Sequence, residues 1–159
     1  MEKKTKMKKF IATFLLIILV VSAVSTTAFA ANTTDTFYAI DATESGKFVS
    51  TSGRIKEDST PVYAKITWLG DYTTTVRAQA QGAEVNKDGY YFNCTCNSAG
   101  NSTNYVTLTI NVNQSIRSLV YENGCSYARL GFQSIPGATG QPVYGWWSPD
   151  SSREHTVAS

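Results

Sequence analysis

Apolar and polar residues alternate one by one through most of the chain after residue 35, and this alternation limits the fold more than any other feature. Residues 105–112 give the clearest example, because Val106, Leu108 and Ile110 share one parity while Tyr, Thr and Asn occupy the other. Successive side chains of a strand point to opposite sides, so such a segment presents one face to a core and one to water. The pattern predicts half-buried antiparallel strands.

Two further segments show the same two-residue period. Residues 74–81 alternate in this way, and so do residues 62–68, where the apolar parity includes Val62 and ends at Trp68. We therefore expect Trp68 to face the core together with Val62. No segment after residue 30 has a sustained helical period, so the domain is predicted to be all-β.

About eight or nine strands, spaced by roughly ten residues without an internal repeat, indicate a single antiparallel β-sandwich over residues 36–148. A small closed β-barrel is the alternative. The dipeptide Asn123-Gly124 suits a two-residue hairpin turn, because both positions of that turn need positive φ. Residues 31–35 are predicted to be a disordered lead-in, and residues 149–159 a polar C-terminal tail.

The first 30 residues have the pattern of a cleaved secretory signal, which would form an N-terminal helix. Five lysines lie within the first nine positions, an apolar run extends from Phe10 to Val24, and the small-x-small triplet Ala28-Phe29-Ala30 follows. This pattern predicts secretion after cleavage near Ala30, with no stable membrane anchor afterwards. An uncleaved membrane anchor is the alternative, because no charged residue occurs between Phe10 and Thr34.

Cleavage would reverse the sign of the net charge. The whole chain has 14 Lys and Arg against 12 Asp and Glu, for a formal charge of +2. Removing five lysines and Glu2 with the signal leaves nine basic and eleven acidic residues. The exported part is therefore slightly acidic, which argues against nucleic acid as a partner.

Three cysteines follow the signal, and an exported chain can oxidise them. Cys94 and Cys96 lie two positions apart, so a bond between them would strain a strand. We expect one of the two to pair with Cys125 and the other to remain as a buried thiol or an intermolecular partner. A zinc site is not predicted, because the paired ligand spacing is absent.

Catalytic machinery is not predicted. His155 is the only histidine, and it lies in the expected polar tail close to Asp150, Ser151 and Ser152. A Ser-His-Asp triad needs three groups held in register by rigid elements, which such a tail does not provide. Most carboxylates lie at turn positions, where they are expected to be solvated. We therefore predict a protein that is not an enzyme, with no cofactor, metal or catalytic residues.

Aromatic residues near the C-terminal end are the best candidates for a contact surface. Neighbouring side chains of a strand face opposite ways, so at least one of Trp146 and Trp147 should face outward if this segment is extended. Tyr144, Trp146 and Trp147 are the predicted binding residues, because an exposed aromatic ring suits a sugar ring or a protein surface. The alternative is that both tryptophans pack against the domain.

The C-terminal region, from Ser126 to Leu130 and from Tyr144 to Asp150, resembles the ends of small secreted proteins of Gram-positive bacteria whose function is unknown. The resemblance implies a secreted β domain and no catalytic residues. We therefore predict a non-catalytic extracellular binding or interaction module, with cell-wall glycan or an extracellular protein as its partner. A bacteriocin-like or antagonism-related secreted protein is one alternative, and an extracellular hydrolase is another.

Overall fold

The computed structural model describes residues 32–42, 47–70, 73–136, 141–152 and 155–159. Within them the chain forms eleven strands and no helix, and hence no helix long and apolar enough to cross a membrane. The strands are β1 Thr36–Asp41, β2 Val49–Ser50, β3 Arg54–Ile55, β4 Val62–Leu69, β5 Thr75–Ala83, β6 Phe92–Asn93, β7 Val106–Thr109, β8 Asn113–Ile116, β9 Tyr127–Gln133, β10 Pro142–Ser148 and β11 Thr156–Val157. The predicted signal segment lies outside the described residues.

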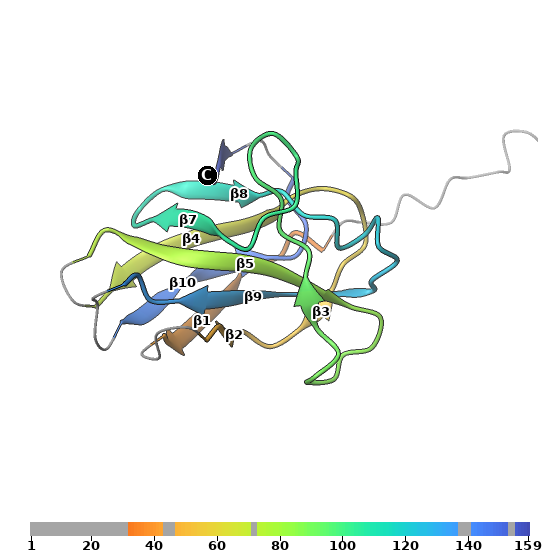
Figure 1. Cartoon of the computed structure of the whole chain (residues 1–159), viewed down its shortest axis with the longest axis horizontal. Helices are drawn as coiled ribbons and strands as arrows, with labels where there is room; N and C mark the ends of the chain where they lie inside the picture. The colour runs from red at the N-terminus through yellow and green to blue at the C-terminus, as the bar shows by residue number, and fades with distance from the viewer. Residues whose placement is uncertain (1–31, 43–46, 71–72, 137–140, 153–154) are drawn as a thin grey trace, which may run out of the picture.

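The strands form two sheets with open edges, as expected for a sandwich and not for the alternative closed barrel (Figure 1). One sheet has the order β1-β10-β4-β8-β11. The other has the order β2-β9-β5-β6, with β3 on β9 and β7 on β5. Every pairing is antiparallel except that of β11 with β8. The predicted all-β class is confirmed. The strands exceed the predicted eight or nine because four of them have only two residues.

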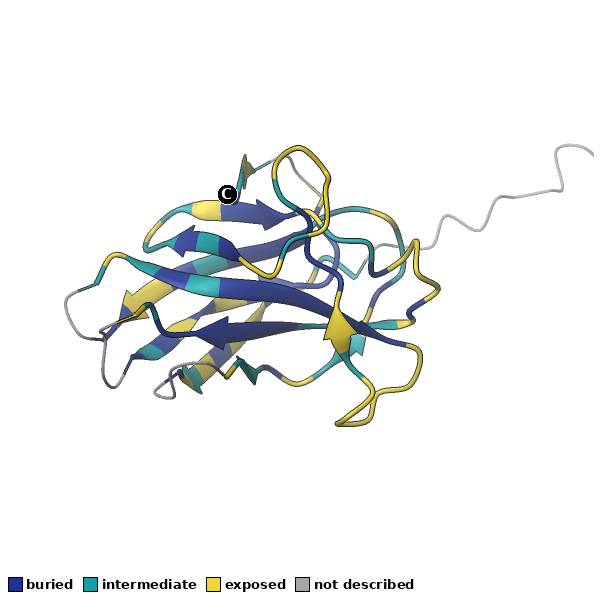
Figure 2. Cartoon of the chain, viewed as in Figure 1, coloured by how far each residue is buried: buried dark blue, intermediate teal, exposed yellow. Residues whose placement is uncertain are grey.

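The core lies between the two sheets, where the inner faces meet (Figure 2). Strands β5 and β9 are buried along most of their length because they pair on both edges. Trp147 and Phe132 are the largest fully buried side chains, and the ring of Tyr38 stacks on Phe132 at 5.0 Å. These three side chains come from β10, β1 and β9, so they connect the two sheets through the core.

A β-bulge changes the direction of side chains in β4. Tyr144 of β10 pairs with Trp68, whereas the next residue, Gly145, pairs with Ile66, so Thr67 has no partner in the ladder. An extra residue in one strand shifts its inward-outward alternation by one position. Thr67 and Trp68 are therefore both exposed, and the prediction that Trp68 faces the core is wrong.

The C-terminal residues are part of the folded domain, which corrects the predicted boundary at residue 148. Asp150 is fully buried, and its carboxylate accepts from Lys56 Nζ at 2.6 Å and from the backbone N–H groups of Asn32 and Glu57 at 2.8 and 3.1 Å. Residues 156–157 form β11 on the edge of β8. Asn32 was expected in a disordered lead-in, but this bond and two side-chain bonds hold it in place.

The predicted hairpin at Asn123-Gly124 is also wrong. Only Gly124 has positive φ, at 74°, and no strand precedes the turn at residues 118–122. The N–H of Gly124 instead donates to the Tyr121 carbonyl at 2.9 Å, and that of Cys125 to the Val120 carbonyl at 3.1 Å. A compact turn thus leads into β9.

Candidate binding surface

Four aromatic side chains project from the outer face of the β1-β10-β4 part of the five-stranded sheet. They are exposed by about half: Phe37 (52%), Trp68 (45%), Tyr144 (38%) and Trp146 (43%). Register explains their shared face, because Phe37 lies opposite Trp146 and Tyr144 lies opposite Trp68. We call these four residues the aromatic strip.

The rings of the aromatic strip contact one another in a continuous row. Trp68 and Tyr144 are stacked, with centroids 5.0 Å apart and planes at 25°. Phe37 lies 6.5 Å from Tyr144 and meets Trp146 edge-on at 5.4 Å. Mutual contact limits the rotation of each ring, so the strip offers a nearly preformed apolar surface across three strands.

A polar pocket of about 360 Å³ opens on the same side of this sheet, beyond Lys65. Its lining includes Asp35, Tyr63, Asn113, Ser148, Ser151, Ser152 and His155. Lys65 lies opposite Trp146 in the register, and Tyr63 lies opposite Ser148. Residues two apart on a strand share a face, so the pocket continues the surface on which the strip lies.

Aromatic and amide groups form one wall of the polar pocket. The hydroxyl of Tyr63 donates to Asn113 Oδ1 at 2.9 Å, and the His155 ring lies 4.7 Å from the Tyr63 ring. Burial raises the pKa of Tyr63, and the negative charge of Asp35 raises it further. Tyr63 therefore stays a neutral phenol at physiological pH, which keeps its O–H as the donor to Asn113.

A family model matches the part of the chain that contains the aromatic strip. A family model described as a protein of unknown function, DUF2712, matches residues 26–151. The chain belongs to the DUF2712 family. The matched DUF2712 region includes the whole aromatic strip and the buried Asp150, whereas His155 and β11 follow it. No curated protein and no solved structure matches the chain.

The structure separates the three aromatic residues predicted for binding in this DUF2712 chain. Tyr144 and Trp146 are exposed in the aromatic strip, whereas Trp147 is 1% exposed and packs in the core. The Arg54 guanidinium lies 5.6 Å from the centre of the Trp147 ring. Trp147 is therefore a packing residue, and its prediction as a contact residue is corrected.

Sequence reasoning missed Phe37 and Trp68. Phe37 could have been found, because residues 36–41 alternate and place it on the parity opposite the buried Tyr38. Trp68 could not, because the bulge that turns it outward depends on pairing with β10. His155 was expected in a tail but lies in the polar pocket, where its ring lies against that of Tyr63.

The cysteines lie away from this surface. All three cysteines are buried free thiols. Cys94 and Cys125 belong to a small apolar cluster with Val120 and Ala128, whereas Cys96 lines a separate hollow beside Pro61 and Arg117. Among the described residues, no three His, Cys, Asp or Glu side chains gather closely enough to hold a metal ion.

Proposed function

We propose that this DUF2712 chain is a secreted, non-catalytic module that binds cell-wall glycan through the aromatic strip and the polar pocket. The connected row of four half-exposed rings is the observation that carries the proposal. A contiguous exposed apolar patch on a small domain is typical of an interaction site, whereas single exposed apolar residues are ordinary.

The chemistry next to the strip favours a glycan over a protein partner. A sugar has an apolar C–H face that stacks on an aromatic ring and a rim of hydroxyls that need hydrogen bonds. The polar pocket supplies a carboxylate, an amide, hydroxyls and an imidazole within reach of the strip's surface. Its volume of about 360 Å³ lies within the range of small-ligand sites.

Location outside the cell is supported by the sequence pattern of residues 1–30, with its lysines, apolar run and Ala28-Phe29-Ala30 triplet. The slightly acidic charge expected after cleavage gives little electrostatic attraction to anionic polymers. Binding would therefore depend on stacking and hydrogen bonds more than on charge. We expect it to survive moderate salt concentrations.

The test is a binding isotherm of the purified protein on protease-treated cell-wall sacculi. Trp146→Ala should weaken binding at least tenfold, because it removes one of the two large indole rings of the strip, on the middle strand β10. Tyr121→Ala is the matched control, since Tyr121 is 48% exposed but lies outside the strip. Circular dichroism should show both variants folded.

Two outcomes would contradict the proposal. Equal retention of wild type, Trp146→Ala and Tyr121→Ala would remove the strip from the binding surface. Wild-type binding to untreated cell walls that is absent on the protease-treated sacculi would identify a protein as the partner in place of glycan.

A further inference from the structure

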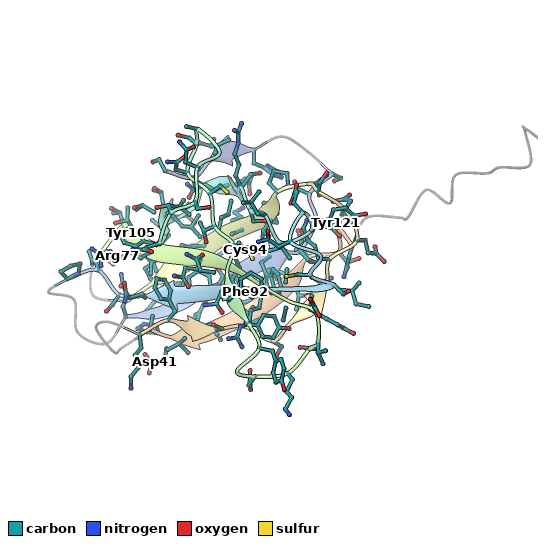
Figure 3. All side chains as sticks on the ribbon, turned by 45° about the vertical axis from the view of Figure 1, so that its right-hand side comes forward. Asp41, Arg77, Phe92, Cys94, Tyr105 and Tyr121 are labelled. Atoms are coloured by element: carbon teal, nitrogen blue, oxygen red, sulfur yellow. The ribbon has the colours of Figure 1, made fainter. Side chains whose placement is uncertain are left out.

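Cys94 and Cys125 lie in contact inside the small apolar cluster that they form with Val120 and Ala128. Their side chains are 4% and 3% exposed. Cys94 directly follows β6, at the start of the segment that links β6 to β7, and lies inside the domain (Figure 3). The cluster is separate from the main core between the sheets.

Gly82 of β5 leaves room for the two sulfur atoms. A methyl group on Gly82 would lie 2.9 Å from Cys125 Sγ and 3.1 Å from Cys94 Sγ. Glycine in the interior of a strand is unfavourable because it adds chain entropy and no packing. The sulfur pair therefore explains why this position of a buried central strand has no side chain.

Cys96 is directed elsewhere. Its N–H donates to the Arg117 carbonyl at 2.7 Å, and it lines the hollow beside Pro61 and Arg117. The backbone of Cys94 is held differently, because its N–H donates to the Ala80 carbonyl at 2.9 Å. The two neighbouring cysteines thus enter different surroundings, and Cys94 and Cys125 supply the three atoms nearest to a side chain at Gly82.

We propose that Cys94 and Cys125 form a disulfide as the chain folds outside the cell, with Cys96 left as a thiol. Two S–H bonds break and one S–S bond forms. The two electrons and two protons reduce an external disulfide, such as an oxidised small thiol or a thiol oxidoreductase, to two thiols. The physiological setting rests on the proposed export, whereas the pairing itself rests on the geometry around Gly82.

The bond should form during folding and not after it. Burial and, after it, the neighbouring Cys94 raise the pKa of the Cys125 thiol to about 11. Burial also raises the pKa of Cys94. Thiol-disulfide exchange requires a thiolate, so the reduced folded protein should oxidise slowly, whereas an unfolded chain reacts freely.

The test is refolding of the reduced, denatured protein with oxidised and reduced glutathione, followed by denaturation, alkylation and intact-mass measurement. Wild type should carry one alkyl group, and Cys96→Ser should carry none. Cys94→Ser should leave two thiols free to alkylate. Addition of glutathione to protein already folded in the reduced state should give the same product at least tenfold more slowly.

Three alkyl groups on refolded wild type, or oxidation that disappears in Cys96→Ser, would overturn the assignment. These readouts work on denatured protein, so a variant that folds poorly still reports its thiols. They are also independent of wall binding. A protein that forms the disulfide but does not bind sacculi would contradict the proposed function alone. A protein that binds sacculi but does not form the disulfide would contradict the disulfide alone.

Discussion

Aromatic rings on the outer faces of the two sheets differ in what contacts them. On the six-stranded sheet, Arg77 covers Tyr105 at 4.4 Å, with both residues labelled in Figure 3, and Arg129 covers Tyr91 at 4.1 Å. On the five-stranded sheet, the rings of the aromatic strip lie against one another. The first arrangement covers the faces of the rings with charged groups, and the second leaves an apolar row facing solvent.

Polar side chains complete this contrast. Gln81 accepts from Arg129 Nε at 2.7 Å and donates to Gln79 at 2.9 Å, and Gln79 donates to the Asn104 carbonyl at 2.6 Å. In this chain of hydrogen bonds, the polar groups of Gln79 and Gln81 bond to other groups of the protein and not to a ligand. The comparison indicates that the part of the six-stranded face around Tyr105 and Tyr91 is covered by its own side chains, whereas the aromatic strip is available to a ligand.

The largest expected effect on stability comes from breaking a buried ion pair, compared with an exposed one. Asp150→Ala should lower the free energy of unfolding by about 4 kcal/mol, because the buried Lys56 ammonium loses its buried carboxylate at 2.6 Å and keeps only the longer ion pair with Asp58 at 3.7 Å. Asp88→Ala removes the ion pair of Arg129 on the other face, where Asp88 is 99% exposed, and should have no measurable effect. Urea unfolding measures both. Equal losses of unfolding free energy in the two variants would show that the buried ion pair contributes no more to stability than the exposed one.

The next largest effect is the difference in stability cost between alanine substitutions at one glycine of each sheet. A methyl group on Gly145 would lie 2.1 Å from the Lys65 backbone oxygen, which cannot move without disturbing β4. On Gly131 it would first meet Gln81 Nε2 at 2.9 Å, the end of a side chain that can rotate. We expect Gly145→Ala to cost about 3 kcal/mol and Gly131→Ala about 1 kcal/mol in thermal unfolding. The reverse order would mean that β4 and β10 can separate at no cost.

The class of fold was predictable because alternation is a local property. Residues 105–112 and 74–81 show their buried parity without knowledge of any partner. The pairing of distant segments is not local. Trp68 follows the apolar parity of β4 in sequence, yet the bulge opposite Tyr144 turns it outward. Two-residue strands such as β11 are likewise too short to show a period.

The site was predictable only in part, for a related reason. Opposite orientation of Trp146 and Trp147 follows from strand geometry, but which of them is buried depends on the sheet that β10 joins. Residues near Asp150 look like a polar tail because they are small and hydrophilic. Their burial depends on Lys56, almost a hundred positions earlier, which no local pattern connects to them.

The smallest predicted effect tests whether the contrast between the faces is functional. Phe37→Ala removes a ring at the β1 end of the aromatic strip and the edge contact that supports Trp146 at 5.4 Å. It should weaken binding to sacculi by about fivefold, or roughly 1 kcal/mol, since a phenyl ring on the edge strand β1 offers less contact area than the indole ring of Trp146. Tyr105→Ala is the matched change on the other face, where the ring is 37% exposed but covered by Arg77, and it should leave the isotherm unchanged. If Tyr105→Ala weakened binding as much as Phe37→Ala, the ligand would not distinguish an open aromatic row from a covered ring, and the five-stranded face would lose its claim to be the binding surface.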